Sequence, residues 1–345
     1  AGNVATLNRV ILPVIRRVMP TVIANELVGV QPMTGPVGQI HTLRVRYSDT
    51  MNDTSAGNTD TTAGEEALSP FKIAEAYSGD AATAKAASTA ALEGAAGRKM
   101  SIQILKQTVE AKTRKLSARW TFEAAQDAQS MHGIDVEAEI MAALAQEITA
   151  EIDQEVIGSL VTLSGTAAQT YDQAAVSGTA TFVGDEHAAL AVQINRVSNL
   201  IAQRTRRGAG NWAVVSPFAL TILQSATTSA FARTTEGTFE APTNTKMVGT
   251  LNNAMKVYVN TYAADNAPVL IGYKGASESD AAAFYCPYIP LMSSGVVLDP
   301  GTFEPTVSFM TRYGYVELNN TASSLGNAAD YLGNVAITDT SVSFS

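Results

Sequence analysis

The architecture of this chain follows from the stretch GIDVEAEIMAALAQEITAEIDQEVIGSL, residues 133–160. Large apolar residues fall at every fourth position in it. Four residues turn an α-helix by about 400°, so this stripe advances about 40° at each step and winds about 240° around the helix. We expect such a helix to contact different elements at its two ends; the alternative is an ordinary core helix with a drifting stripe. The stripe consists of Val136, Ile140, Leu144, Ile148, Ile152, Val156 and Leu160.

Residue types mark the ends of this helix and of the helix before it. A first helix is expected to begin after Trp120 and to end at His132-Gly133, because glycine readily adopts the left-handed conformation that closes a helix. Asp135 then supplies a side-chain oxygen that caps the next helix. The sequence therefore predicts two consecutive helices, the second running to about residue 161.

Upstream, two alternating stretches flank a segment that is poor in large apolar residues. Leu43, Val45 and Tyr47 alternate with Arg44 and Arg46, which is typical of a strand with one solvated face. Residues 102–113 alternate again and predict a returning strand. The intervening residues bury too little apolar surface to offset the entropy of ordering them. We therefore expect a long two-stranded excursion whose tip needs a partner surface to become ordered.

Downstream of the long helix the pattern mixes helices and strands. This succession predicts a second globular unit and an α+β fold overall. Helices are expected over residues 187–207 and from 217, and strands over 212–215, 256–262, 269–273 and from 285 onward.

Composition excludes several classes of protein. The chain has 345 residues, 46% of them hydrophobic, and a net charge of −9, which indicates a folded acidic protein. One cysteine, Cys286, cannot form an intramolecular disulfide, and the three histidines lack the neighbours of a zinc site. No run reaches the roughly 20 apolar residues that span a bilayer. A dedicated nucleic-acid binder is also disfavoured, because such proteins depend on an excess of cations.

Catalytic motifs are not found, with one apparent exception. Residues 208–213, GAGNWA, satisfy the dinucleotide pattern G-x-G-x-x-G/A. That motif must follow a strand and open a helix, whereas here a helix is expected before it and a strand after it. We interpret the loop as a helix end and predict no enzyme activity, no cofactor and no metal. A nucleotide-dependent oxidoreductase is the alternative from another class.

Charge is distributed unevenly along the chain. Residues 1–46 carry five arginines and one acid, and residues 98–119 carry seven cations and one acid, whereas residues 120–195 carry twelve acids and no Lys or Arg. We hypothesise that the basic segments of one subunit lie on the acidic helix of a neighbour. The alternative is that the charges pair within one subunit or face water. The residues expected at these contacts are Arg9, Arg16, Arg17, Arg98, Lys99, Lys106, Lys112, Arg114, Lys115, Glu137, Glu139, Glu147, Glu151 and Glu155.

Five short motifs, in order along the chain, carry a resemblance to a known family. The motifs are Gly29-Val30-Gln31-Pro32-Met33 with Gly35-Pro36, Ala125-Gln126-Asp127 before His132-Gly133-Ile134-Asp135, Gly272-Tyr273-Lys274-Gly275 with Asp280, Tyr285-Cys286-Pro287-Tyr288, and Thr311-Arg312-Tyr313-Gly314. With these motifs the chain resembles the major capsid proteins of T-even-type tailed bacteriophages.

The resemblance implies the HK97-type capsid fold. Its parts would be an N-terminal arm over residues 1–46, an E-loop over 47–107, a peripheral domain with a long spine helix over 108–165 and an axial domain over 166–290. Residues 291–345 would return to the peripheral domain and form the C-terminal strands. The E-loop has little room for the insertion domain that T-even proteins carry there, so a decoration protein or loop contacts would replace its stabilisation.

The same resemblance implies a structural function. The chain would assemble with itself as hexamers, or also as pentamers, into the icosahedral head that encloses phage double-stranded DNA. Implied partners are a scaffold, a prohead protease that cuts after a glutamate, a portal, and vertex or decoration proteins, with Ala1 as the first residue after that cut. The protein would be assembled in the bacterial cytoplasm and reside in the virion. A nanocompartment shell of the same fold is the alternative.

Overall fold

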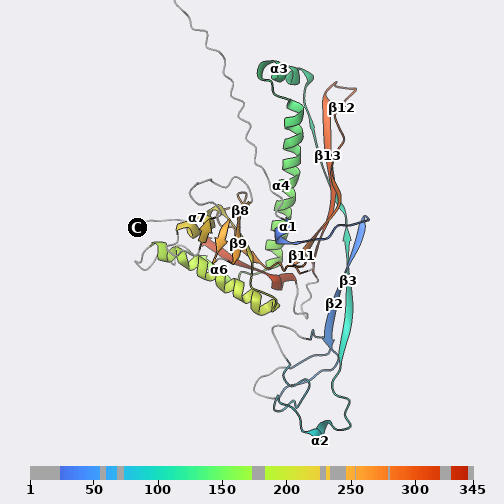
Figure 1. The fold of residues 1–345 in the computed structure, drawn as a ribbon, viewed down its shortest axis with the longest axis vertical. Coiled ribbons are helices and arrows are strands. Elements are labelled where there is room, and N and C mark those ends of the chain that lie inside the picture. The colour runs from blue at the N-terminus through green and yellow to red at the C-terminus, as the bar shows by residue number, and fades with distance from the viewer. Residues whose placement is uncertain are drawn as a thin grey trace, which may run out of the picture.

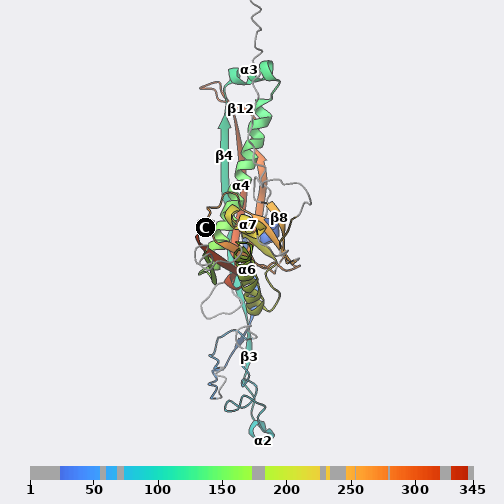
Figure 2. The same ribbon diagram turned by 90° about the vertical axis from the view of Figure 1, so that its left-hand side faces the viewer.

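The computed structural model describes residues 24–54, 60–67, 74–172, 183–225, 231–233, 246–252, 254–278, 280–318 and 328–340. The molecule is elongated (Figure 1). A two-stranded hairpin projects from one end, a five-stranded sheet with the long helix forms the other end, and a seven-stranded sheet lies beside the middle. Turned by 90°, these parts form one narrow column (Figure 2).

The five-stranded sheet is built on the long strand β13 (Pro305–Glu317). β11 (Ala283–Ser293) and β4 (Lys112–Arg119) pair antiparallel with its two sides, and β12 (Val297–Leu298) pairs with its first residues. β1 (Gly29–Val30), which follows the short helix α1 (Ala24–Leu27), adds to β11 in parallel. Val307, Phe309 and Thr311 are buried in alternation, as the sequence predicts.

Two consecutive helices lie where the sequence predicts them. α3 (Phe122–His132) ends at Gly133, which has a φ of 67° in the left-handed region. α4 (Val136–Ser164) begins after Asp135, whose carboxylate accepts a hydrogen bond from the Glu137 backbone N–H. These end signals are local, so they act whatever the rest of the fold does.

The winding stripe of α4 does contact different elements at the two ends of the helix. Leu144, Ile148 and Ile152 pack with residues of β13, including Val307 and Phe309. Further along, Val156, Ile157 and Leu160 pack instead with residues of the seven-stranded sheet, including Trp212, Val214 and Leu270. α4 therefore joins the two sheets, and the expectation from its stripe is confirmed.

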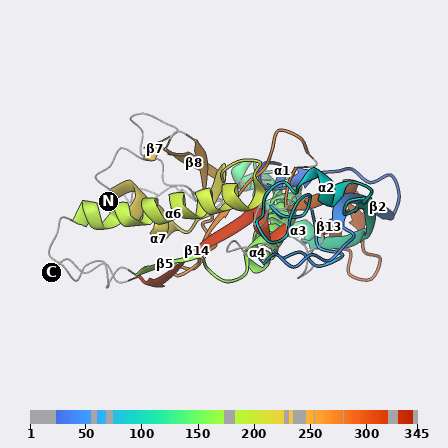
Figure 3. The ribbon, with the colours of Figure 1, turned by 90° about the horizontal axis from the view of Figure 1, so that it is seen from below.

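The seven-stranded sheet has helices on one face and the end of α4 on the other. Its order is β5-β14-β10-β6-β9-β8-β7. Seen from below, α6 runs along this sheet, away from the hairpin (Figure 3). The elements are β5 (Gln169–Asp172), α6 (Val183–Thr205), β6 (Trp212–Val215), α7 (Pro217–Ser225), β7 (Phe231–Arg233), β8 (Lys246–Leu251), β9 (Met255–Val259), β10 (Val269–Gly272), the 3-10 helix η1 (Ala328–Tyr331) and β14 (Leu332–Asp339).

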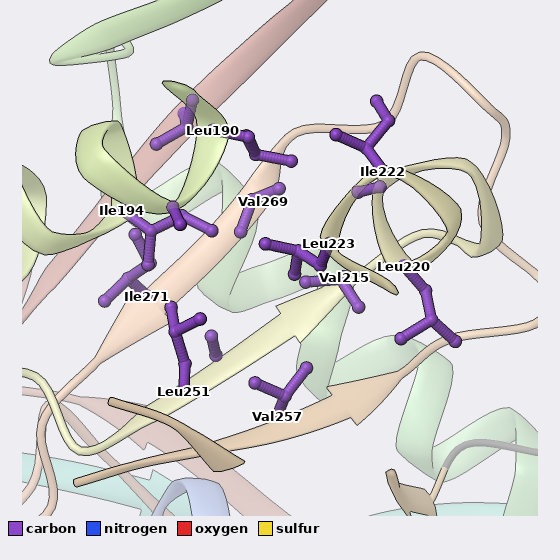
Figure 4. Packing of buried hydrophobic residues seen from close by; sticks show 14 of the residues in the cluster. Leu190, Ile194, Val215, Leu220, Ile222, Leu223, Leu251, Val257, Val269 and Ile271 are labelled. Carbon is purple, nitrogen blue, oxygen red and sulfur yellow. The ribbon is translucent and has the colours of Figure 1, made fainter. Parts of the chain in front are cut away.

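The largest apolar cluster fills the space between this sheet and helices α6 and α7 (Figure 4). Leu190 and Ile194 of α6 and Leu223 of α7 meet Val215 and Ile271 of the central strands. Every residue of β6 and β10 is buried. Strands that are covered on both faces need apolar residues throughout, and the sequences of these two strands are accordingly continuous apolar runs.

The hairpin consists of β2 (Val37–Tyr47) and β3 (Met100–Glu110), paired antiparallel in one unbroken register from Val37 opposite Glu110 to Tyr47 opposite Met100. The expected two-stranded excursion is thus present. Its outgoing strand starts at Val37, inside the segment that the resemblance assigns to the arm. The short helix α2 (Thr89–Leu92) lies at the tip.

The chain after residue 283 serves both sheets. β11, β12 and β13 belong to the five-stranded sheet, and β11 begins within the segment assigned to the axial domain. β14, by contrast, lies in the seven-stranded sheet between β5 and β10. The C-terminal segment therefore ties the two units together.

Candidate assembly surfaces

One face of the hairpin is apolar and exposed. Antiparallel partners share a face, so Leu43 lies beside Ile104, and Val45 lies beside Ile102. Leu43 is 65% exposed and Ile102 is 68% exposed. An apolar face of this kind on a projecting two-stranded hairpin is typical of an interaction surface.

The face of β2 that carries Leu43 is the solvated one. Arg44 is only 4% exposed, because its guanidinium donates to the Glu66 carboxylate at 2.9 Å, and Arg46 donates to the Gly64 carbonyl. The alternation correctly predicts a strand, but the arginines face the returning tip segment and Leu43 faces solvent. Alternation alone does not say which face another part of the chain covers.

The tip segment has a small core of its own. The rings of Tyr47 and Tyr77 pack in a tilted arrangement with their centroids 4.5 Å apart, and Met51, Ala67 and Ala76 are buried with them. The sequence composition was expected to leave this segment without a core until a partner covered it. Within the described part of the tip, two tyrosines and several small residues suffice to form a satellite cluster.

Arg98 and Lys99, expected at contacts between subunits, are used inside the tip. The Arg98 guanidinium donates to the carbonyls of Ala76, Tyr77 and Gly79 and lies over the Tyr77 ring. The Lys99 backbone N–H donates to the Asp49 carboxylate, and the Lys99 carbonyl accepts from Tyr77. Both of these bonds use backbone atoms of Lys99, and the residue is exposed.

Arg114 of β4 connects three elements. Its guanidinium donates to Glu151 at 2.8 Å and to Glu155 at 2.5 Å, both on α4, and its Nε donates to the Tyr313 hydroxyl of β13 at 2.6 Å. The Tyr313 hydroxyl in turn donates to Glu155. For these residues the charges pair within one chain, which is the second of the two alternatives that the sequence left open. We call Arg114, Glu151, Glu155 and Tyr313 the Arg114 cluster.

Within the Arg114 cluster, the pKa of Glu155 is lowered and the pKa of Tyr313 is raised. Burial alone would raise the pKa of Glu155, but the hydrogen bonds from Tyr313 and Arg114 outweigh it and hold the pKa below 4.5. Burial and the bond to Glu155 raise the pKa of Tyr313 to about 12. At neutral pH Glu155 is therefore a carboxylate and Tyr313 a neutral donor, which fits the observed bonds.

The other charged residues expected at contacts are spread over several surfaces. Lys106 lies opposite His41, on the apolar hairpin face beside Leu43. Lys112 and Lys115 are exposed on β4, while Glu137 and Glu139 lie in the first turn of α4 and Glu147 lines a cavity next to Glu151. Residues Ala1, Arg9, Arg16 and Arg17 lie outside the described residues.

A second exposed apolar surface lies at the end of the molecule opposite the hairpin, and the sequence reasoning missed it. Phe122 at the start of α3 contacts Phe303, which is 67% exposed and has a φ of 58°. Val297 and Leu298 of β12 are exposed nearby in the same strand-and-turn segment. We call these four residues the far tip. A bulky aromatic residue in the left-handed region is strained, and such strain concentrates at functional positions.

The glycine loop at residues 208–213 does not have the geometry of a dinucleotide site. α6 precedes it and β6 follows it, as expected. A Cβ on Gly208 would lie 2.7 Å from the Tyr273 ring, and one on Gly210 would lie 2.9 Å from Ile271. These glycines thus permit close packing against β10 and do not open a phosphate cradle.

Across the described ranges, no helix is long and apolar enough to cross a membrane, and no group of three or more His, Cys, Asp or Glu side chains is arranged to hold a metal ion.

Comparison with solved structures identifies the fold. A chain from Microbacterium phage Oxtober96 matches with a TM-score of 0.57 at 11% identity over 96% of both chains. The capsid of the Myoviridae phage XM1 matches with a TM-score of 0.51 at 10% identity, covering 94% of this chain and 95% of that one. The fold defines the class: it is the fold of HK97-like phage capsid proteins.

Sequence comparison then identifies the family. Residues 4–337 match the family model described as major capsid protein Gp23. The major capsid protein of Enterobacteria phage T4 is 30% identical over 414 positions, covering 95% of this chain and 78% of that protein, and that of Vibrio phage KVP40 is 28% identical over 425 positions, covering 95% and 80%. The chain belongs to the Gp23 family of major capsid proteins.

Family membership establishes the role. The protein is a structural, non-enzymatic component that assembles with itself into the head shell of the virion. The T4 alignment has 414 positions, more than the 345 residues of this chain, so the T4 protein carries segments that this chain lacks.

Proposed function

We propose that subunits of the shell join head to tail, with the apolar hairpin face of one subunit on the far tip of the next. The observation that carries this proposal is the pair of exposed apolar surfaces at opposite ends of one elongated chain. Within the described part of the subunit, Leu43, Ile102 and Ile104 of the hairpin face and the four far-tip residues stay exposed, whereas Val45 packs partly against the tip cluster. Burying both against each other removes apolar area from water, which is the main source of affinity in such contacts.

Charge supports this pairing and its direction. The hairpin face carries Lys106 beside its apolar residues, whereas the far tip is bordered by Glu123 and Asp127 of α3 and Asp299 of the adjoining turn. Exposed pairs of this kind add only about 0–1 kcal/mol each, so they select the orientation while buried area supplies the strength. The E-loop and the acidic face of the peripheral domain are then partners between subunits.

A contact between two different surfaces closes into a ring when its rotation divides a full turn. We infer rings of six, with rings of five from the same chain as the alternative. The N-terminal arm, with Arg9, Arg16 and Arg17, is assigned to a further contact with a neighbour. We propose the same role for the remaining charged residues expected at contacts. These are Lys112 and Lys115 on β4 and Glu137, Glu139 and Glu147 on α4.

Other partners follow from the family and are proposed with it. They are a scaffold, a prohead protease, a portal, vertex or decoration proteins, and packaged double-stranded DNA. The net charge of −9 supports contact with DNA that is unspecific and weak, because few phosphates would be neutralised. A nanocompartment shell is the less favoured reading of the same fold.

The apolar hairpin face is tested by placing a negative charge first on that face and then on the opposite face of the hairpin. We expect Ile102→Asp to abolish assembly into large particles, measured by light scattering after size exclusion and by electron microscopy. Gln103→Asp is the matched control, since Gln103 is exposed on the opposite face. Loss of assembly in both variants, or in neither, contradicts the proposed surface.

A charge exchange tests the neighbour. Lys106→Glu is expected to weaken assembly, and Asp127→Lys in the same chain is expected to restore it, because the pair is reversed without changing either apolar surface. If the second substitution weakens assembly further, the far tip is not the partner of the hairpin.

A further inference from the structure

The Arg114 cluster lies at the place where α4 changes partners. The apolar contacts of α4 with β13 end at Ile152, and its contacts with the seven-stranded sheet begin at Val156. Glu155 falls between these two contacts and Glu151 lies just before Ile152, and Arg114 binds both carboxylates. The helix is therefore held here by charged and polar groups, while both of its flanking segments are held by apolar packing.

A second polar contact holds the same level of the helix on its other side. The amides of Gln154 and Asn260 exchange two hydrogen bonds at 3.0 and 3.2 Å, which joins α4 to the residue after β9. Gln154 and Glu155 are neighbours in sequence, so one turn of α4 is tied both to the seven-stranded sheet and, through Arg114, to β4.

Open space surrounds the cluster on both sides. One cavity of about 480 Å³ is lined by Arg114, Glu147, Glu151 and Tyr262. Another of about 520 Å³ lies between α4 and the root of the hairpin, and Glu155 borders both cavities. Gln107 and Glu110 of β3, Lys112 of β4 and Tyr313 and Glu317 of β13 line the second cavity together with Glu155. At the level of the cluster, the hairpin root therefore faces a cavity. The segments of α4 on either side of this level are instead packed against apolar side chains.

The cluster is also next to that root in the chain. β3 ends at Glu110 and β4 begins at Lys112, so only Ala111 separates the hairpin from the strand that carries Arg114. The Ala111 backbone N–H donates to the Pro36 carbonyl at the start of the other hairpin strand. A change in the distance between β4 and α4 is transmitted directly to the hairpin.

We propose that the Arg114 cluster is a latch, sensitive to protons and to salt, which holds the root of the hairpin at a fixed position relative to α4 and the seven-stranded sheet. In the closed state Arg114 spans the gap between β4 and α4. In the open state the two elements separate at this level, while the apolar contacts on either side remain. The latch goes beyond assembly itself, because it acts within one subunit.

The pH dependence follows from Glu155. The pKa of Glu155 in the folded protein lies below 4.5. The latch is therefore closed while Glu155 is a carboxylate, and it opens as the pH falls through this folded pKa. The tyrosines that face it are neutral throughout this range. The titratable and charged groups around Glu155 are Arg114 and Lys112 from β4, Tyr313, Tyr315 and Glu317 from β13, Tyr285 from β11, Glu110 from β3 and Glu151 from α4.

The test measures hydrogen exchange of backbone amides in the full-length, unassembled chain. Arg114→Gln is expected to speed exchange about tenfold over residues 107–118, the size of change expected when a charge-assisted network is lost. Strands 212–215 and 269–272 are expected to keep their exchange rates. Arg119→Gln is the control, since Arg119 lies on the same strand in an exposed pair with Glu304 at 3.7 Å.

Two further measurements keep the proposal falsifiable if Arg114→Gln folds poorly. Tyr313→Phe keeps the ring in its apolar cluster and removes only the hydroxyl, and it is expected to speed exchange over the same residues by a smaller factor. High salt is expected to do the same in the unchanged protein. The latch is overturned if these treatments leave residues 107–118 unchanged, if Arg119→Gln has the same effect, or if the difference between parent and Arg114→Gln persists well below the folded pKa of Glu155.

Discussion

A Cβ atom on Gly314 would lie 2.4 Å from Cγ1 of Val109, so β13 and the hairpin root approach each other more closely than any other residue would allow. Gly314→Ala is therefore expected to destabilise the subunit by about 1–3 kcal/mol, the usual cost of overpacking. Urea unfolding of the unassembled subunit measures this change.

Gly158→Ala is the matched control for Gly314. Gly158 lies within α4, and a Cβ there would have open space around it. Alanine is the better helix former by about 0.5–1 kcal/mol, so this variant is expected to be as stable as the parent or more stable. Equal losses in both variants would show that close approach at Gly314 is not the cause.

The two apolar contacts of α4 are expected to contribute independently. Ile148→Ala and Leu160→Ala should each cost about 2–5 kcal/mol, because each removes a buried side chain from a different cluster. The buried members of the two clusters do not overlap, although Tyr285 packs against both, so the double variant should equal the sum within about 0.5 kcal/mol. Free energies of unfolding from denaturant titration test this, and a coupling well above that margin would mean that α4 and both sheets form one cooperative core.

The tip of the hairpin is expected to depend on Arg98. Arg98→Ala removes the donor to three carbonyls, so residues 74–86 should become more susceptible to limited proteolysis. Lys99→Ala is the neighbouring control, because Lys99 supports the tip through its backbone N–H and carbonyl, which the substitution retains. Similar cleavage in both variants would show that the hydrogen bonds of Arg98 do not order the tip.

Attachment of β1 is expected to weaken in acid. The Val30 backbone N–H donates to the Glu278 carboxylate at 2.8 Å and lowers the pKa of Glu278 below 4.5. Such a carboxylate contributes stability above its unfolded pKa and loses it as the pH falls through the folded value. Solvent screens this exposed group, so the effect should stay under about 1 kcal/mol.

Urea unfolding at pH 6 and pH 3 compares the parent with Glu278→Gln. The parent should lose more stability over this interval than the variant, because only the parent has a carboxylate to protonate at this position. An identical loss in the two proteins would place the acid sensitivity elsewhere.

Local signals were sufficient to predict several elements. Gly133 and Asp135 mark the boundary between α3 and α4, and the winding stripe of α4 correctly predicts contacts with two different bodies. The order of elements around residues 208–213 also excludes a dinucleotide site from sequence alone. These predictions succeed because capping and helical periodicity depend on residues within a few positions of one another.

The candidate surfaces were less predictable. Sequence alternation places Leu43 and Arg44 on opposite faces of β2, but only Glu66, brought back by the tip, decides that Arg44 is the buried one. Likewise the charge pattern identifies Arg114, Glu151 and Glu155 as partners, but it does not say whether one chain or two would pair them.

The sequence by itself thus determined the long helix, its caps and the charge of each segment. Tertiary structure alone decided which faces remain exposed and which charges meet, because burial depends on contacts between residues as distant in sequence as Arg114 and Tyr313. Local chemistry limits the conformation of each segment, whereas desolvation and pairing arise only after distant segments have come together.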